Sequence, residues 1–259
     1  MSRASGSPQL FVTTTTFSAL LVIAAAGWVF LVSSESAMRL MSGDGFVLDL
    51  MWLMMKPSDL GPYFFAAAVM WAAMMIAMMI PAVLPMAAVY RKIERDGFHA
   101  GPIDTFAFAS GYLLAWCAFS VVAAGLQWWL HVNGWLEGMM LTAGTTLAGA
   151  ILLAAGLYQF TPLKEACLAR CRSPLSFFLD HWQPGTLGAL RMGIRHGWFC
   201  IGCCWMLMML MFAGGAMSVV TMALLTAFIV GERLLPAGIW VTRIPGFALC
   251  AVGVFLLSS

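Results

Sequence analysis

The chain has 259 residues, of which 62% are hydrophobic and only 9% are charged, and its formal net charge is +2. This composition excludes a soluble globular domain and is typical of an integral membrane protein. The small net charge gives no indication of nucleic acid as a partner, so membrane lipid is the first partner that we expect.

Long apolar runs follow one another along the chain. A helix needs roughly 20 mostly apolar residues to cross about 30 Å of hydrocarbon. We therefore expect an all-α fold, a polytopic transmembrane helix bundle that forms a single integral membrane domain over residues 1–259, with a cytoplasmic connection at residues 162–197. About seven spans are expected, at Phe17–Val32, Tyr63–Tyr90, Thr105–Trp129, Met139–Phe160, Gly188–Phe212, Ala216–Val230 and Ile239–Leu257.

The basic residues divide the connections between these spans into two classes. If alternate connections face the cytoplasm, all of the 13 Lys and Arg residues except Arg39 and Lys56 lie on that side. The positive-inside rule then predicts an N-in, C-out orientation in the cytoplasmic membrane. Arg3 and the apolar run behind it are also compatible with a cleaved signal peptide, but the length of the run favours a retained helix.

Two local patterns refine this outline. Phe46–Met55 is apolar with a single acid and predicts a short interfacial helix that is ended by Pro57. Ala213-Gly214-Gly215 predicts a tight turn between the fifth and sixth spans, because glycine permits unusual backbone conformations.

The second expected span is dense in methionine and contains Pro81 and Pro85. Met75, Met79 and Met86 fall within about 40° of one another on a helical wheel. One interpretation is a thioether face that can hold a soft cation such as Cu(I). The other is that methionine fills irregular gaps where a proline-kinked helix packs. The sequence leaves both interpretations open.

The long cytoplasmic connection is expected to begin with a short helix. Thr161 as N-cap and Pro162 at the first helical position predict a helix that extends to Arg172. Cys167 and Cys171 then lie four residues apart on one face. Such a thiol pair can chelate one metal ion, and the basic residues nearby favour the thiolate form that metal binding and redox chemistry both require.

The most informative stretch is MGIRHGWFCIGCCWMLMMLM, residues 192–211. His196, Cys200, Cys203 and Cys204 fall inside an arc of roughly 100° on the expected helix, so one face carries an imidazole and three thiols. Packing is one explanation, because neutral thiols are tolerated in lipid and nearby glycines let a neighbouring helix approach. A histidine beside three thiols at a membrane boundary is costly, however, and favours a metal or thiol-chemistry site.

These thiols, the Pro81–Met86 end of the second span and the Cys167/Cys171 helix are all expected at one depth, near the cytoplasmic face. Depth alone does not bring them together laterally. That the two groups of thiols share one pocket is therefore a hypothesis for the structure to address.

Three segments carry a resemblance to a known family: GIRHGWFCIGCCWMLMMLMFAGG, YQFTPLKEACLARCRSPL and WAAMMIAMMIPAVLPM. They resemble a bacterial family of predicted metal-binding integral membrane proteins of unknown function. The resemblance runs from about Tyr63 to Pro236 and is most specific at the H-x3-C-x2-C-C and C-x3-C elements. It implies a metal role in the bacterial inner membrane, with no established substrate. The positions carried over are His196, Cys200, Cys203, Cys204, Cys167 and Cys171.

Two mechanisms from different classes remain. In the first, the protein binds a soft transition metal and moves, stores or hands it over; the methionines favour Cu(I), although zinc accepts Cys and His ligands equally well. In the second, the thiols form a membrane thiol–disulfide relay that could feed a quinone. A predicted cytoplasmic placement disfavours structural disulfides. A third possibility is an assembly partner without chemistry.

Other transport and enzyme classes have less support. The sequence has no nucleotide-binding loop, and the expected spans lack acids apart from Glu232 at a helix end. Ion-coupled active transport is therefore poorly supported. We assign no catalytic residues, and the pattern favours a metal-binding protein over an enzyme, with a protein partner that the sequence does not identify.

Overall fold

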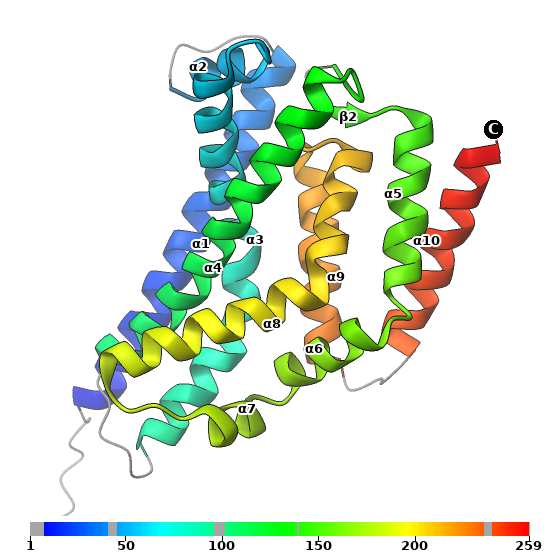
Figure 1. The fold of residues 1–259 in the computed structure, drawn as a ribbon. Coiled ribbons are helices and arrows are strands. Elements are labelled where there is room, and N and C mark those ends of the chain that lie inside the picture. The colour runs from blue at the N-terminus through cyan, green and yellow to red at the C-terminus, as the bar shows by residue number, and fades with distance from the viewer. Residues whose placement is uncertain (1–7, 41–45, 96–101, 139, 236–239, 259) are drawn as a thin grey trace, which may run out of the picture.

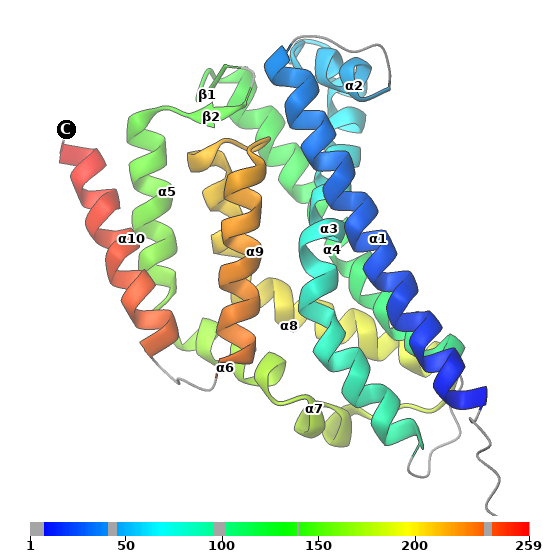
Figure 2. The same cartoon turned by 180° about the vertical axis from the view of Figure 1, so that it is seen from behind.

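Helices run back and forth between two ends of the molecule (Figures 1 and 2). The structure is a computed structural model that describes residues 8–40, 46–95, 102–138, 140–235 and 240–258. The described chain is helical apart from one hairpin of two-residue strands, which confirms the expected all-α class. In chain order the elements are α1 (Pro8–Leu40), α2 (Phe46–Met54), α3 (Leu60–Arg95), α4 (Pro102–Val132), β1 (Leu136–Glu137), β2 (Thr142–Ala143), α5 (Thr145–Tyr158), α6 (Pro162–Arg172), α7 (Pro174–His181), α8 (Gly185–Gly214), α9 (Val219–Leu234) and α10 (Trp240–Ser258).

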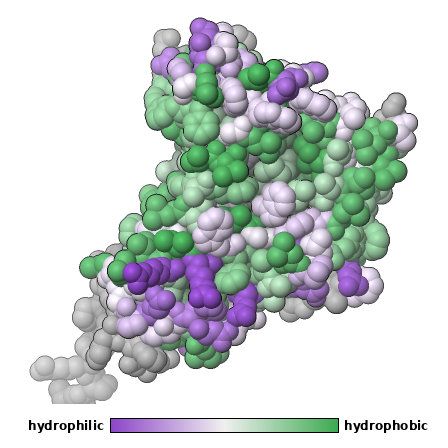
Figure 3. Space-filling view, viewed as in Figure 1, coloured by the Kyte–Doolittle hydropathy of each residue, from purple (hydrophilic) through white to green (hydrophobic). Residues whose placement is uncertain are grey.

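Several helices have the length and apolar character of membrane spans. Among the described residues these are α1, α3, α4, α8 and α10, and the α5–α6 pair, bent by 66°, makes a sixth if it is counted as one span. In Figure 3 apolar residues cover the middle of the visible face, and hydrophilic residues gather toward its two ends. Helix α9, at the expected sixth span, has only 16 residues. A multi-pass membrane protein is thus supported, while seven spans and their orientation stay predictions.

The two ends of the bundle carry different elements. Helix α2 and the β1–β2 hairpin lie at one end, here named the α2 end, and α6 and α7 lie at the other, here named the α6 end (Figures 1 and 2). Helix α1 starts near the α6 end, whereas the C-terminus lies at the α2 end. The predicted N-in, C-out orientation would therefore place the α6 end in the cytoplasm.

Three short elements follow the sequence-based expectations. Helix α2 occupies the segment before Pro57. Thr161 caps α6, because its side chain accepts a hydrogen bond from the Lys164 backbone N–H, and Pro162 takes the first helical position. Gly215 ends α8 with a φ of 91°, a backbone conformation that only glycine adopts without strain.

The fourth expected span begins later than predicted. We expected it from Met139, which lies outside the described residues, whereas α5 begins only at Thr145. Thr142 and Ala143 instead form β2, which pairs with β1, so that Leu136 lies opposite Ala143. A run of apolar residues does not distinguish a helix from a short strand and turn, which is why the sequence pattern failed here.

The close packing of α8 against α4 positions the thiol-bearing helix. A Cβ atom on Gly193 would lie 2.0 Å from the Phe108 carbonyl oxygen, and one on Gly111 would lie 2.2 Å from the Leu190 carbonyl oxygen. The two backbones therefore touch without space for a side chain. Small residues at such a crossing allow van der Waals contact between backbones, which drives helix association in lipid.

We predict that Gly193→Ala destabilises the protein by about 1–3 kcal/mol, because the added methyl group must displace the backbone of α4. The measurement is the thermal unfolding midpoint of the purified protein in detergent. Gly125→Ala is the matched control: it adds the same group within α4, where the nearest atom, Phe64 Cε2, is 3.8 Å away. Equal midpoints for the two variants would contradict the proposed interface.

Candidate metal site

The thiols of α8 lie inside the bundle and contact one another. Cys200, Cys203 and Cys204 are all buried. The Cys200 and Cys204 Sγ atoms are 4.0 Å apart, and the Cys203 and Cys204 thiols donate hydrogen bonds to the Cys200 carbonyl oxygen at 3.1 and 2.9 Å. Because the i, i+3 and i+4 positions of a helix share one face, the three sulfurs form a compact group.

Helix α6 brings a second pair of thiols to the same place. Cys171 is buried, and its thiol lies beside that of Cys203. Cys167, one turn earlier, packs on Gly202, where an added Cβ would lie only 2.7 Å from the Cys167 Sγ atom. Thiols from two distant parts of the sequence thus meet between α6 and α8.

Two residues that sequence reasoning missed complete the surroundings of Cys200. The Arg233 guanidinium, from the end of α9, donates to the Cys200 Sγ atom, and its second terminal nitrogen donates to the Ala82 carbonyl oxygen of α3 at 3.2 Å. The Tyr112 hydroxyl of α4 lies 3.0 Å from the same sulfur. Arg233 was interpreted only as a marker of the cytoplasmic side, and no sequence signal distinguished Tyr112 from any other aromatic residue of its span.

A buried ion pair holds α9 against α6. The Lys164 Nζ atom lies 2.8 and 2.9 Å from the two carboxylate oxygens of Glu232, and both side chains are almost wholly enclosed. The Arg172 Nε atom donates to the Glu232 carbonyl oxygen at 2.6 Å. These contacts fix Arg233, the next residue along α9, beside the thiols of α6 and α8.

His196 lies one turn before Cys200 in an aromatic enclosure. Its ring stacks on those of Phe108 and Tyr112, with centroids 6.0 and 5.5 Å away, and meets Phe177 edge-on. The residue is fully buried, and neither of its ring nitrogens has a hydrogen-bond partner. Burying an imidazole without a hydrogen-bond partner lowers the stability of the fold by about 1–3 kcal/mol. The His196 ring nitrogens therefore keep the capacity to bind a ligand.

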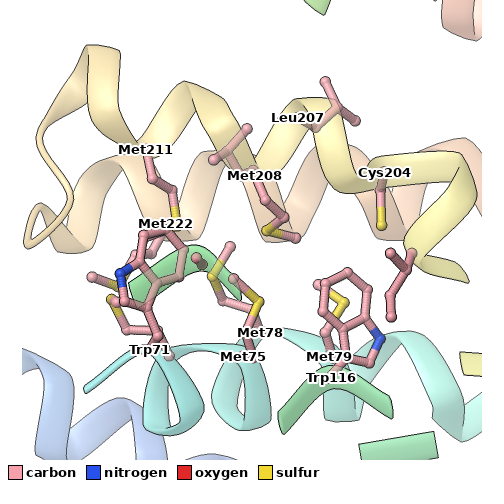
Figure 4. Packing of buried hydrophobic residues seen from close by; sticks show 14 of the residues in the cluster. Trp71, Met75, Met78, Met79, Trp116, Cys204, Leu207, Met208, Met211 and Met222 are labelled. Atoms are coloured by element: carbon pink, nitrogen blue, oxygen red, sulfur yellow. The ribbon is translucent and has the colours of Figure 1, made fainter. Parts of the chain in front are cut away.

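The methionine face of α3 is directed toward α8. Met75, Met79 and Met86 are all buried. Figure 4 shows Met75, Met78 and Met79 on one side of the packed interior and Met208, Met211 and Cys204 on the other, with the Cys204 sulfur directed toward α3. The methionines therefore face a sulfur-rich surface of α8, and both sequence interpretations, packing and ligand, are compatible with this arrangement.

The arrangement is not a preformed metal centre. In the part of the chain that the structure describes, no three or more His, Cys, Asp or Glu side chains are grouped so as to hold a metal ion. The thiols instead bind one another and Arg233, while His196 is enclosed by aromatic rings. An ion held by these residues would have to replace thiol–thiol and thiol–guanidinium contacts.

The fold and these contacts define a helical protein with several membrane-length helices, whose interior gathers thiols, thioethers and a guanidinium. Residues 68–256 match the model of the PpoB2 family, which is described as a copper chaperone. Because this match covers most of the chain, the protein belongs to that family. The expected metal-related family is thereby confirmed, whereas a bacterial inner-membrane location stays a prediction. No curated protein and no solved structure gives a significant match.

We predict that Glu232→Gln lowers stability by about 3–5 kcal/mol, because it leaves the Lys164 ammonium buried without a counter-charge. Thermal unfolding in detergent measures the effect. The double variant Lys164→Met/Glu232→Gln removes both charges and should lose less stability than the sum of the single changes. Arg170→Gln is the control, because it breaks an exposed ion pair with Asp180 whose loss should cost no more than about 1 kcal/mol. Additive losses in the double variant would show that the pair is not coupled.

Proposed function

We propose that the protein binds a soft transition-metal ion, Cu(I) in preference to zinc, at the thiols between α6 and α8 and hands it to a partner. The observation that carries the proposal is that Cys171 of α6 lies beside the thiols of α8 in a buried position, with Cys167 packed on Gly202. Cys171 and Cys203 are the first two ligands, and Cys200 is the third. Cys204, whose Sγ atom is 4.0 Å from that of Cys200, is the fourth ligand, and Cys167 and His196 are the reserve ligands within one turn.

The spacing of the sulfurs supports this assignment. At a metal–sulfur distance of about 2.3 Å, two sulfurs on one ion are separated by about 3.8 Å at a tetrahedral angle and about 4.6 Å in a line. The Cys200 and Cys204 sulfurs are 4.0 Å apart, within that interval. Modest rotations of the side chains, after loss of the thiol protons, are therefore enough for both to reach one ion.

Arg233 supplies the charge that such a complex needs. Two or more thiolates around one Cu(I) ion carry a net negative charge, which is costly in an apolar interior without a counter-charge. The guanidinium already donates to Cys200 and lies 3.8 Å from the Cys203 Sγ atom. It can keep these contacts with the outer lone pairs of metal-bound sulfur, so Arg233 acts as a positioning residue and counter-ion rather than as a ligand.

Copper is preferred over zinc for two reasons. Thioether ligands select Cu(I), and the methionine face of α3 lies opposite the Cys204 sulfur (Figure 4). The family description also links the chain to copper. In this proposal Met75, Met79 and Met86 are weak ligands that lead the ion to or from the thiols.

A second candidate function rests on the same contact. Oxidation of Cys171 and Cys203 to a disulfide would release two protons and two electrons, with a quinone as the acceptor. All seven cysteines are free in the structure. A thiol–disulfide relay and a metal site therefore use the same pair of residues, and only measurement separates them.

We predict that protein purified from copper- and zinc-supplemented cells contains stoichiometric copper, and that Cys203→Ser and Cys171→Ser lose it, because both replace a soft ligand by a hard one. Metal analysis of the purified chain measures this. Cys117→Ser and Cys250→Ser are matched controls, since each removes a thiol outside the cluster.

Other outcomes of that analysis support other functions. A metal-free wild type with reversible oxidation of Cys171 and Cys203 would support the relay. Zinc in place of copper would support a metal site at these thiols and would contradict the assignment of copper to it. Thiol replacements that change neither metal content nor partner function would favour an assembly partner without chemistry.

We predict that Arg233→Gln weakens Cu(I) binding by roughly ten- to a hundredfold, because it removes a charge-assisted hydrogen bond to sulfur. Competition with a chromophoric Cu(I) chelator gives the affinity. Arg243→Gln, which removes an exposed charge of α10, is the control and should bind as the wild type does. An unchanged affinity in Arg233→Gln would remove Arg233 from the site.

A further inference from the structure

A second group of sulfur ligands lies at the α2 end, opposite the thiols. A small apolar pocket there is lined by eight residues, and five of them are methionines. They come from four separate segments: α1, α2, the turn after α2 and the turn between α8 and α9. These methionines are Met38, Met51, Met54, Met55 and Met217.

The pocket is small, with a volume of about 20 Å³. Five methionine side chains surround a space that has room for one monovalent ion and not for a larger ligand. Four of them are buried, and Met55 is partly buried. Trp52 also lines the pocket.

Hydrogen bonds fix one wall of the pocket, and one residue of its lining has an unusual backbone conformation. The Gln127 amide, itself buried, donates to the Met54 Sδ atom at 3.8 Å and to the Tyr63 hydroxyl at 3.2 Å. Leu141, in the opposite wall, has a φ of 52°, a left-handed conformation that costs about 1–3 kcal/mol outside glycine and that clusters at functional sites.

A hydrogen bond joins two of the segments that line the pocket. The Glu35 carboxylate accepts it from the Val219 backbone N–H at 2.9 Å, and so joins α1 to the first turn of α9. Glu35 is one helical turn from Met38, and Val219 is two residues from Met217. The segments that carry Met38 and Met217 are therefore held together beside the pocket.

We propose that this pocket is a separate binding site for a soft monovalent cation, Cu(I) or its analogue Ag(I), coordinated by thioether sulfurs. Uncharged thioethers select Cu(I) over harder ions such as Zn(II), and they need no deprotonation. In this proposal a row of buried thioethers that includes Met211, Met222 and Met75 (Figure 4) passes the ion from the pocket toward the thiols. Only the delivery along this row rests on the proposed function; binding in the pocket does not.

The test is equilibrium dialysis of the purified full chain against Ag(I) in chloride-free buffer. We expect Met51→Leu/Met54→Leu to lose one Ag(I) equivalent relative to the wild type, at neutral pH and at about pH 5 alike, because thioethers do not bind protons. Leucine conserves volume, so the pocket should stay folded. Met217→Leu removes a ligand from another segment and should weaken the same equivalent. Met209→Leu, at a buried methionine outside the pocket, is the control.

The pocket and the thiol site can fail separately. Cys203→Ser should lose a different equivalent and keep the one that depends on Met51 and Met54. If Cys203→Ser has no effect while the methionine variants lose an equivalent, the pocket stands and the thiol proposal fails. If Met51→Leu/Met54→Leu, folded as judged by its unfolding midpoint, binds as much Ag(I) as the wild type, the proposed pocket site is overturned.

Discussion

The contact between Arg233 and Cys200 is the interaction on which the interior depends. A guanidinium cannot give up its proton, so inside an apolar bundle it must find acceptors. It finds them on two helices, at the Cys200 sulfur of α8 and the Ala82 carbonyl oxygen of α3. Because the preceding residue, Glu232, is paired with Lys164 of α6, the end of α9 joins α3, α6 and α8 at one point. The thiols lie at that point.

Thioethers line the pocket at the α2 end, the thiols lie between α6 and α8, and the two chemistries would give the proposed transfer a direction. Thioethers are neutral, bind Cu(I) weakly and are insensitive to pH, whereas thiolates bind it tightly and release protons as they do so. An ion that enters at the α2 end would therefore move down a gradient of affinity toward Cys200 and Cys203. Release from the thiols then requires a partner with competing soft ligands, which is what a chaperone needs in order to deliver its cargo only on contact.

The sequence predicted those features that depend on neighbouring residues. Helix α6 and its Thr161 cap, the turn at Gly215 and the shared face of Cys200, Cys203 and Cys204 all follow from local spacing. The hypothesis that α6 thiols approach α8 came from membrane depth, and the lateral contact itself needed the structure. Arg233 and Tyr112 were missed, because their roles come from packing between helices far apart in sequence. The predicted start of α5 was wrong, because a short apolar hairpin has no distinctive sequence periodicity.

Packing explains the glycines of α8 more fully than it explains its thiols and histidine. Gly193 and Gly197 face α4 and Gly202 faces Cys167, and at each position a side chain would collide with the neighbouring helix. An apolar ring at position 196 would avoid two unpartnered nitrogens. The imidazole at this position therefore has an energetic cost that packing alone does not offset. That cost is understandable if these atoms bind something else during the protein's working cycle.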